Sequence, residues 1–269
     1  MPFTTSHPAI VLPLKKLFPK YISLSGLMAG AMSPDLIYFI EMNTVNRGLS
    51  HSWSGLFTIC VPLGILFCFA FHWLIKKELI YSLPLKMSRH LSGVADSKWS
   101  IATISDALVL IISVLLGALS HFFWDSFTHL TGEMVSVFPV LKNEITLLGF
   151  SILLYHLLQH LSTIFGMVGI IVWFTFKSNL PPQSTEFQNR SIQDKIIFWV
   201  KSIVISFVFA FLILNLYRYY FPDRVSSETA IFGLAGWAGF FYLTALTTII
   251  NKLKFFLKKS NKIVGSEYN

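Results

Sequence analysis

Charged residues are scarce in this sequence. Asp, Glu, Lys and Arg make up 13% of its 269 residues, whereas 54% are hydrophobic and 26 residues are phenylalanine. The mean hydropathy is +0.64. Soluble globular domains typically have about 25% charged residues. The composition therefore excludes a soluble globular protein and predicts a polytopic membrane protein.

Cysteine is almost absent. Cys60 and Cys68 lie in one apolar run, an arrangement that argues against a disulfide or a cysteine metal site. The first twenty residues also lack the apolar core and small-residue cleavage site of a secretory signal peptide. We therefore expect the N-terminal segment to belong to the mature protein.

Acidic residues are fewer than basic ones, and the net charge is +8. The basic residues gather at the ends of apolar runs, where they are signals of membrane topology rather than a nucleic-acid surface. We expect no nucleic-acid partner, and no pattern predicts a protein partner. The expected partners are membrane lipids and a small-molecule or lipid substrate.

Five apolar runs are each near the ~20 residues that a helix needs to cross a bilayer. They cover residues 53–75, 106–124, 149–176, 195–217 and 229–250. Residues 21–40 are a candidate for a sixth span. The predicted fold class is all-α, a polytopic transmembrane helical bundle.

The N-terminal region predicts an interfacial or re-entrant helical segment. Residues 8–19 are apolar and basic but too short to span a membrane. In residues 21–42, Pro34 removes a backbone donor and disfavours helix in the residue before it. We expect two short helices here, with a break that presents Asp35.

The predicted organisation has four parts. They are a membrane-embedded metal-site domain (1–177), a cytoplasmic linker (178–194), two further transmembrane helices (195–250) and a basic cytoplasmic tail (251–269). The Lys- and Arg-rich loops after the first, third and fifth spans are cytoplasmic by the positive-inside rule. Lys15, Lys16, Lys20 and Arg47 fit this orientation poorly.

A polar stripe marks the end of the second span. His121, Asp125 and His129 are four residues apart, so a helix places them on one face. An unpartnered Asp near the bilayer centre costs roughly 2.5 to 3.5 kcal/mol. The spacing favours metal ligands, and the alternatives are a charge-paired structural cluster or a proton relay.

Other ionisable residues fall towards the same side of the membrane. His51 precedes the outer end of the first span, and His156 and His160 share a face near the outer end of the third. His7 and Asp35 come from the preceding segment. The predicted metal ligands are His7, Asp35, His51, His121, Asp125, His129, His156 and His160, with Asp35, His121 and Asp125 as the catalytic residues. Imidazole and carboxylate ligands suit Zn²⁺, and this set is large enough for two ions, or three.

Four further ionisable residues have simpler interpretations. We expect His72 to hydrogen-bond to a neighbouring helix and His90 to be solvated in a basic loop. Glu41 and Glu133 are near enough in sequence to act as general bases, but solvated loop carboxylates are the simpler reading.

Several motifs together resemble a membrane family, domain of unknown function 4184. They are Met1-Pro2-Phe3-Thr4-Thr5-Ser6-His7-Pro8-Ala9, Ser33-Pro34-Asp35, Ser50-His51-Ser52, Leu116-Gly117-Ala118-Leu119-Ser120-His121, Trp124-Asp125-Ser126-Phe127-Thr128-His129 and Leu158-Gln159-His160. The resemblance covers residues 1 to 170 through these motifs and the rest mainly by hydropathy.

That family is in turn similar to inner-membrane metal-dependent hydrolases, which implies a metal site and hydrolysis. Asn46 stands where their pattern has a His, and Ile37 where it has an Asp, so activity is less well supported than metal binding. The order of ligands also resembles zinc-dependent phospholipase C, remotely and by order and spacing alone. That resemblance implies a ligand role for His7, Asp35, His51, His121, Asp125, His129 and His156, while His160 stands in place of a Glu.

The sequence thus predicts a divalent-metal hydrolase of the bacterial cytoplasmic membrane that acts on a phosphoester or related ester, with a lipid among the candidate substrates. Its site is expected towards the outer face. Two metal ions are a common device for hydrolysing phosphate esters. A metal or proton transporter that uses the same residues, and a non-catalytic protein with a structural metal, are the alternatives.

Overall fold

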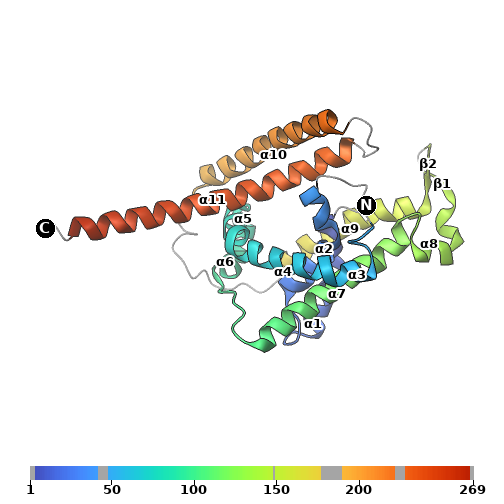
Figure 1. Cartoon of the computed structure of the whole chain (residues 1–269), viewed down its shortest axis with the longest axis horizontal. Helices are drawn as coiled ribbons and strands as arrows, with labels where there is room; N and C mark the ends of the chain where they lie inside the picture. Colours follow the sequence, from blue (N-terminus) through green and yellow to red (C-terminus); the bar gives the residue numbers. More distant parts are fainter. Residues whose placement is uncertain (1–3, 42–47, 148, 177–189, 222–227, 267–269) are drawn as a thin grey trace. The chain divides into compact units, whose positions relative to one another are not determined.

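A computed structural model of the chain describes residues 4–41, 48–147, 149–176, 190–221 and 228–266 (Figure 1). Five stretches of helix are long and apolar enough to cross a membrane: Trp53–Ser82, Ile104–Val137, Leu154–Phe176, Ile192–Tyr220 and Ala230–Leu253. The chain is therefore an integral membrane protein with an all-α bundle fold, as predicted. The helix at residues 24–41 is not among these candidate spans.

The chain divides into two compact units. The first unit contains residues 1–41, 46–68 and 100–177, and the second contains residues 42–45, 69–99 and 178–269. Residues 69–99 thus group with the C-terminal helices, whereas the sequence suggested one domain over 1–177. Most of the predicted linker, 178–189, lies outside the described residues.

The first unit is built mainly from helices. Its elements are η1 (Thr4–Val11), α1 (Leu12–Leu17), α2 (Leu24–Glu41), α3 (Trp53–Gly55), η2 (Leu56–Cys60), most of α4 (Val61–Ala70), α7 (Ile104–Thr128), α8 (Glu133–Val137), η4 (Pro139–Lys142), β1 (Glu144–Leu147), β2 (Phe150–Leu153) and α9 (Leu154–Phe176). Thr103 and Asp106 form a capping box that starts α7, because their side chains satisfy free backbone N–H groups.

Helices α2 and α7 pack with their backbones close together. A Cβ atom at Gly30 would lie 2.0 Å from the Val114 carbonyl oxygen, and one at Gly117 would lie 2.3 Å from the Leu27 carbonyl oxygen. Only glycine permits such an approach. The close crossing brings the backbone of α2 beside the side chains of α7.

The predicted break at Pro34 is wrong, because α2 is continuous from Leu24 to Glu41. Proline at position 34 leaves the Gly30 carbonyl without its usual backbone donor. The Ser33 hydroxyl donates to that carbonyl at 2.9 Å, which compensates for the missing bond. Asp35 is consequently held on a regular helix and is buried.

The third span begins later than predicted. Strands Glu144–Leu147 and Phe150–Leu153 pair in an antiparallel manner, with Glu144 opposite Leu153 and Leu147 opposite Phe150. Gly149 has a φ of 85°, which glycine adopts without steric cost. Helix α9 therefore starts at Leu154 rather than at residue 149.

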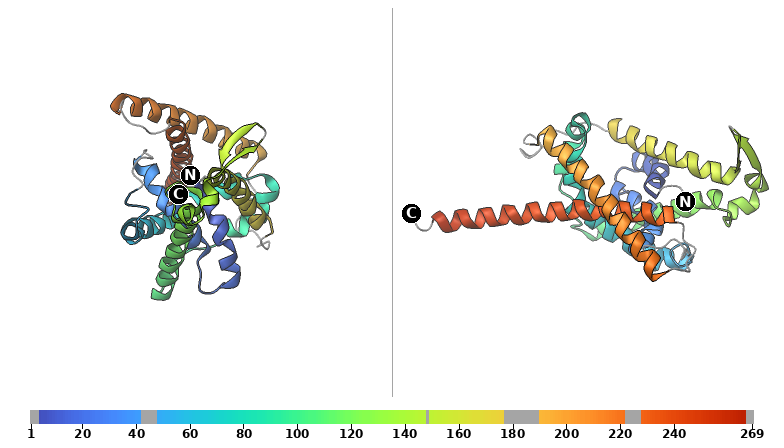
Figure 2. Two further views of the ribbon diagram at one scale, coloured as in Figure 1. Left: turned by 90° about the vertical axis from the view of Figure 1, so that its right-hand side faces the viewer. Right: turned by 90° about the horizontal axis from the view of Figure 1, so that it is seen from above.

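The second unit contains η3 (Phe71–Ile75), α5 (Lys76–Ser82), α6 (Leu85–Asp96), α10 (Ile192–Tyr220) and α11 (Glu228–Ser266). Helices α10 and α11 lie side by side (Figures 1 and 2). The first span continues to Ser82 because Lys76 and Glu78 are buried with polar partners in this unit: Lys76 donates to Ser97 and Glu78 pairs with Arg190.

The histidines of this unit differ from expectation. His72 stacks on Trp99 with a ring separation of 4.3 Å, and its nitrogens have no hydrogen-bond partner among the described residues. Within the described part of the chain, the hydrogen bond predicted for His72 is therefore not formed. His90 lies on helix α6 and is half-buried, not in an extended solvated loop.

Candidate metal centre

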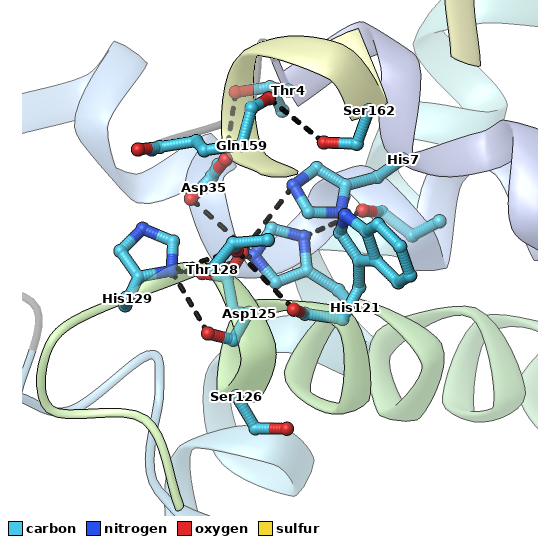
Figure 3. Close-up of polar contacts among 12 residues, drawn as sticks. Thr4, His7, Asp35, His121, Asp125, Ser126, Thr128, His129, Gln159 and Ser162 are labelled. Atoms are coloured by element: carbon cyan, nitrogen blue, oxygen red, sulfur yellow. Dashed lines mark hydrogen bonds and ion pairs between the residues drawn. The ribbon is translucent and has the colours of Figure 1, made fainter. Parts of the chain in front are cut away.

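Four separate segments of the first unit bring His and Asp side chains together. Figure 3 shows the side chains from three of them, η1, α2 and α7. Element η1 carries His7 and α2 carries Asp35, while the turn before α3 carries His51. Helix α7 contributes the largest share, with His121, Asp125 and, at its C-terminal end, His129. The structure thus assembles six of the eight predicted ligands in one cluster.

The spacing of the cluster suits a shared cation better than direct hydrogen bonds. Six His nitrogen to Asp oxygen distances lie between 3.5 and 3.8 Å. A good hydrogen bond is shorter, about 2.7 to 3.2 Å. Ligand atoms around a tetrahedral Zn²⁺ with bonds of about 2.0 to 2.1 Å are themselves about 3.3 to 3.4 Å apart.

Two overlapping groups have metal-ligand geometry. Ligand atoms of His7, His121 and Asp125 all lie within 4.8 Å of one another, and so do those of Asp35, His51 and His121. The two carboxylates have different neighbours: Asp35 Oδ1 faces His51 and His121, while Asp125 faces His7 with Oδ1 and the other histidines with Oδ2. The donor set of imidazoles and carboxylates is one that Zn²⁺ accepts.

The inner part of the cluster is sealed from solvent. The side chains of His121, His7 and Asp35 are at most 1% exposed, whereas those of His51, His129 and Asp125 are 11 to 16% exposed. Both nitrogens of His7, Nε2 of His121 and Oδ1 of Asp125 are buried without a hydrogen-bond partner in the described part of the chain. Such atoms are costly to bury, and a cation among them would satisfy them.

The orientation of His121 strengthens this argument. Its Nδ1 lies 2.9 Å from the Ala31 carbonyl oxygen, so Nδ1 must carry a proton because a carbonyl only accepts. In the neutral ring, Nε2 then presents a lone pair towards Asp35 and Asp125. A lone pair facing two carboxylates is repulsive unless a cation or a proton lies between them.

Further hydrogen bonds hold the other ligands. Thr4 donates to Asp35 Oδ2 at 2.8 Å, which leaves Asp35 Oδ1 facing the histidines. The Ser50 hydroxyl lies 3.0 Å from His51 Nδ1, so Nε2 is the nitrogen of His51 that faces the carboxylates. Partners of this kind orient ligands in metal sites and raise their basicity.

His7 lies outside the candidate spans and is prepared as a neutral ligand. Burial, and then the neighbouring His121, hold the pKa of His7 well below its ordinary value of 6.5. Its ring stacks on that of His121 with centroids 3.9 Å apart. Since only the neutral imidazole binds a metal, this environment favours coordination.

The structure does not bring His156 and His160 to the cluster. Both side chains are exposed. Helix α9 packs against η1 with a face that carries Tyr155, Gln159 and Gly166; a Cβ at Gly166 would lie 2.8 Å from the Ser6 carbonyl oxygen. His156 follows Tyr155 and His160 follows Gln159, so each histidine is rotated by one residue, about 100°, away from the face that contacts η1.

Three buried polar residues near the cluster were not among the predicted site residues. Thr4 contacts Asp35, while Thr128 and Gln159 are buried beside the cluster (Figure 3). Thr128 and Gln159 each come one position before a predicted ligand, His129 and His160, and this proximity in sequence was the available hint. Glu41 and Glu133 are exposed, as solvated carboxylates are expected to be.

Fold and site together define an integral membrane protein with a buried His/Asp centre that suits a divalent cation. The family model for domain of unknown function DUF4184 matches residues 1–249, so the chain belongs to this family. No curated protein sequence and no solved structure matches the chain. The similarity to metal-dependent hydrolases and to phospholipase C therefore stays a prediction.

Proposed function

We propose that the protein is a membrane-bound, divalent-metal-dependent hydrolase of a phosphoester or related ester. The observation that carries the proposal is the buried cluster of six His and Asp side chains, spaced at 3.5 to 3.8 Å. A buried set of this kind is expensive unless it binds a cation. Zinc is the ion that its ligand types favour.

The six side chains suffice for two ions if Asp125 bridges them. His121 can serve only one ion, because its Nδ1 is engaged by the Ala31 carbonyl. Asp125 can serve both, since its two oxygens face different histidines. Three protein ligands for each ion would leave positions for water and substrate, as catalytic zinc sites do.

Bound divalent ions would lower the pKa of water to about 7 and stabilise the charge that develops on a phosphoryl group. The protein groups fix this arrangement: Thr4 orients Asp35, and the Ala31 carbonyl orients His121. In the reaction, the oxygen of water bonds to phosphorus as the P–O bond to the alcohol breaks. The alcohol keeps the bonding electrons and gains a proton. His129, at the solvent-accessible edge of the cluster, is placed to exchange that proton.

We place the protein in the bacterial cytoplasmic membrane with the centre towards the outer face. The support is the positive-inside rule, since Lys86, Arg89 and Lys98 follow the first span and Lys254, Lys258, Lys259 and Lys262 follow the fifth. In whole cells, a membrane-impermeant maleimide should label a cysteine introduced at Thr131, which is exposed.

Transport is the weaker alternative. A pathway along α7 would need polar groups on the helix half away from the cluster. Between Asp106 and Ser120, Ser113 is the one residue of α7 with a polar side chain. Its hydroxyl accepts a hydrogen bond from Ser23 N and donates one to the Val109 carbonyl. No polar route leads from the cluster along this helix.

The test is hydrolysis of a panel of soluble phosphomonoesters, phosphodiesters and carboxylic esters by purified protein. Zinc-loaded wild type should hydrolyse at least one of them, and chelation should abolish the reaction until zinc is restored. Asp125→Ala should be inactive, whereas Ser126→Ala, whose hydroxyl bonds to the backbone carbonyl of Phe123, should retain activity. Metal-loaded wild type that hydrolyses nothing while mediating zinc flux in proteoliposomes would replace this function with transport.

A further inference from the structure

The β1–β2 strand pair lies between two candidate spans, one that ends at Val137 and one that begins at Leu154. Figure 1 shows the pair at the N-terminal end of α9. An exposed apolar side chain on a span contacts the hydrocarbon of the bilayer, so its exposure needs no other explanation. Phe150 is 76% exposed but belongs to neither span. Its exposure therefore needs an explanation of its own.

The register of the two strands gives the pair two chemically different faces. Side chains alternate along a strand, and residues directly opposite each other share a face. Ile145 is opposite Ile152, and Phe150 shares their side of the pair, which we call the apolar face. Thr146 is opposite Ser151 on the other side, the polar face, and both are exposed. An antiparallel pair with this pattern typically has its apolar face covered and its polar face in water.

The apolar face is turned away from the nearest hydrophobic core of the protein. Leu153, at the base of the polar face, packs with the buried cluster of Val135, Leu141 and Tyr155. Ile152 is its neighbour in the strand and therefore points in the opposite direction. A two-stranded pair is only marginally stable in water by itself. We therefore expect a surface outside this core to cover the apolar face.

Continuity with α9 indicates that this surface is the membrane. Strand β2 ends at Leu153, and α9 with its candidate span begins at the next residue. The base of the strand pair is therefore at the membrane interface. A strand of four residues extends about 13 Å at 3.3 Å per residue, so the whole pair is within reach of the lipid headgroups.

Charge distinguishes this strand pair from another connection between spans. No Asp, Glu, Lys or Arg occurs between Glu144 and Lys177, so the strands continue into α9 without a charged residue. The connection between α10 and α11, in contrast, contains Asp223 and Arg224 and is flanked by the exposed Arg218–Glu228 ion pair. Charged side chains favour water over the acyl region. The strand pair lacks such groups beyond Glu144 at its base.

We propose that the β1–β2 strand pair is an interfacial anchor, with its apolar face on the lipids beside α9 and its polar face in water. Each strand of a two-stranded sheet has one outer edge of backbone N–H and C=O groups, which hydrocarbon does not tolerate. The pair therefore stays in the headgroup region, where water reaches its edges, and its apolar side chains insert by about 5 to 10 Å. This role is independent of the proposed hydrolase function.

The test measures the surroundings of each face in the full-length protein, in nanodiscs of phosphatidylethanolamine and phosphatidylglycerol. A nitroxide spin label is attached at Phe150→Cys on the apolar face or at Ser151→Cys, the matched control on the polar face. Cys60 and Cys68 are buried, and the unmutated protein treated with the label gives the background. Collisions of the label with oxygen, which concentrates in lipid, and with a water-soluble nickel chelate are compared by electron paramagnetic resonance. We expect the oxygen-to-nickel ratio at position 150 to be at least about three times that at position 151.

A second matched pair on the other strand, Ile145→Cys and Thr146→Cys, repeats the comparison, so that the result does not depend on one variant. The same difference between neighbouring positions on both strands would support the anchor. Equal ratios at neighbouring positions would overturn it, whichever reagent dominates. Protection of positions 145 and 150 from both reagents would also overturn it, because a second copy of the chain or another protein would then cover the apolar face.

Discussion

Buried charged groups occur in both units, but their surroundings differ. In the second unit, Arg190 donates to Glu78 at 2.8 Å and to Ser82 at 2.7 Å. Lys195 donates to the Leu83 carbonyl at 2.9 Å and to Ser88 at 2.5 Å. In the first unit, the His and Asp groups stand 3.5 to 3.8 Å apart, and Asp125 Oδ1 has no hydrogen-bond partner among the described residues.

The buried polar groups of the two units therefore have different roles. Cations and anions of the second unit neutralise one another at hydrogen-bond distance, so they tie α5, α6 and α10 together without help. The first unit gathers ligands that share no protein cation, since Lys and Arg are absent from its described ion pairs. We therefore expect mutations in the second unit to change stability, and mutations in the first to change metal binding and activity.

The largest expected effect is on hydrolysis. Asp125→Ala and His121→Ala should each lower the rate on the best substrate by at least about a hundredfold, because each removes a ligand. Neither change should alter the pairs around Glu78. Rates on that substrate and far-ultraviolet circular dichroism measure the two effects. A folded Asp125→Ala protein with wild-type activity would contradict the role of the cluster.

A large loss of stability is expected in the second unit. Glu78→Ala leaves Arg190, whose side chain is 15% exposed, without its carboxylate, and removing one partner of a largely buried ion pair typically costs about 3 to 5 kcal/mol. Denaturant unfolding in detergent measures the loss. The control is Glu228→Ala, because the Arg218–Glu228 pair is exposed and such pairs contribute little. Equal effects of the two substitutions would show that the buried pair is not structural.

Removal of metal should destabilise the first unit. A ligand present at a hundred times its Kd stabilises the folded state by about 2.7 kcal/mol, so chelation should lower the Tm of wild type. Glu78→Ala should show the same shift on chelation, whereas Asp125→Ala should show none. If the Tm of wild type responded neither to chelator nor to added zinc, the folded protein would not bind metal at this cluster.

A smaller effect is expected from the residue that orients Asp35. Thr4→Val deletes the 2.8 Å bond to Asp35 and should weaken zinc affinity about tenfold. Thr5→Val is the matched control, since the hydroxyl of Thr5 forms a weak bond to the sulfur of Met167, at 3.5 Å, and none to a member of the cluster among the described residues. Competition with a fluorescent zinc chelator measures both. If Thr5→Val weakened binding as much as Thr4→Val, the effect would be one of packing.

The smallest effect concerns pH. The pKa of His7 is held well below 6.5, so below about pH 6.5 the unfolded chain binds a proton that the folded chain does not. Stability of the metal-free protein should fall as the pH falls from about 6.5 towards the folded-state pKa. His7→Asn should flatten this dependence. Unfolding at several pH values with chelator present measures it, and identical slopes would contradict a buried neutral His7.

Much of the fold and part of the site followed from the sequence. Hydropathy predicted the spans, and the spacing of His121 and Asp125 predicted one shared helix face, because both are local properties. The break predicted at Pro34 was wrong, because the preference of proline for helix ends does not include the compensating hydrogen bond from the Ser33 hydroxyl to the Gly30 carbonyl. The rotation of α9, which turns His156 and His160 outward, depends on how Gly166 packs against η1. That packing is tertiary, so no pattern within α9 reveals it.

The most direct test of the central claim is metal content. Wild type, Asp125→Ala and Glu78→Ala are purified from zinc-supplemented cells, desalted, and analysed for zinc per chain by mass spectrometry. We expect about two zinc ions per chain in wild type and in Glu78→Ala, and a clear loss in Asp125→Ala. Wild type without bound metal, or the same content in all three proteins, would contradict it.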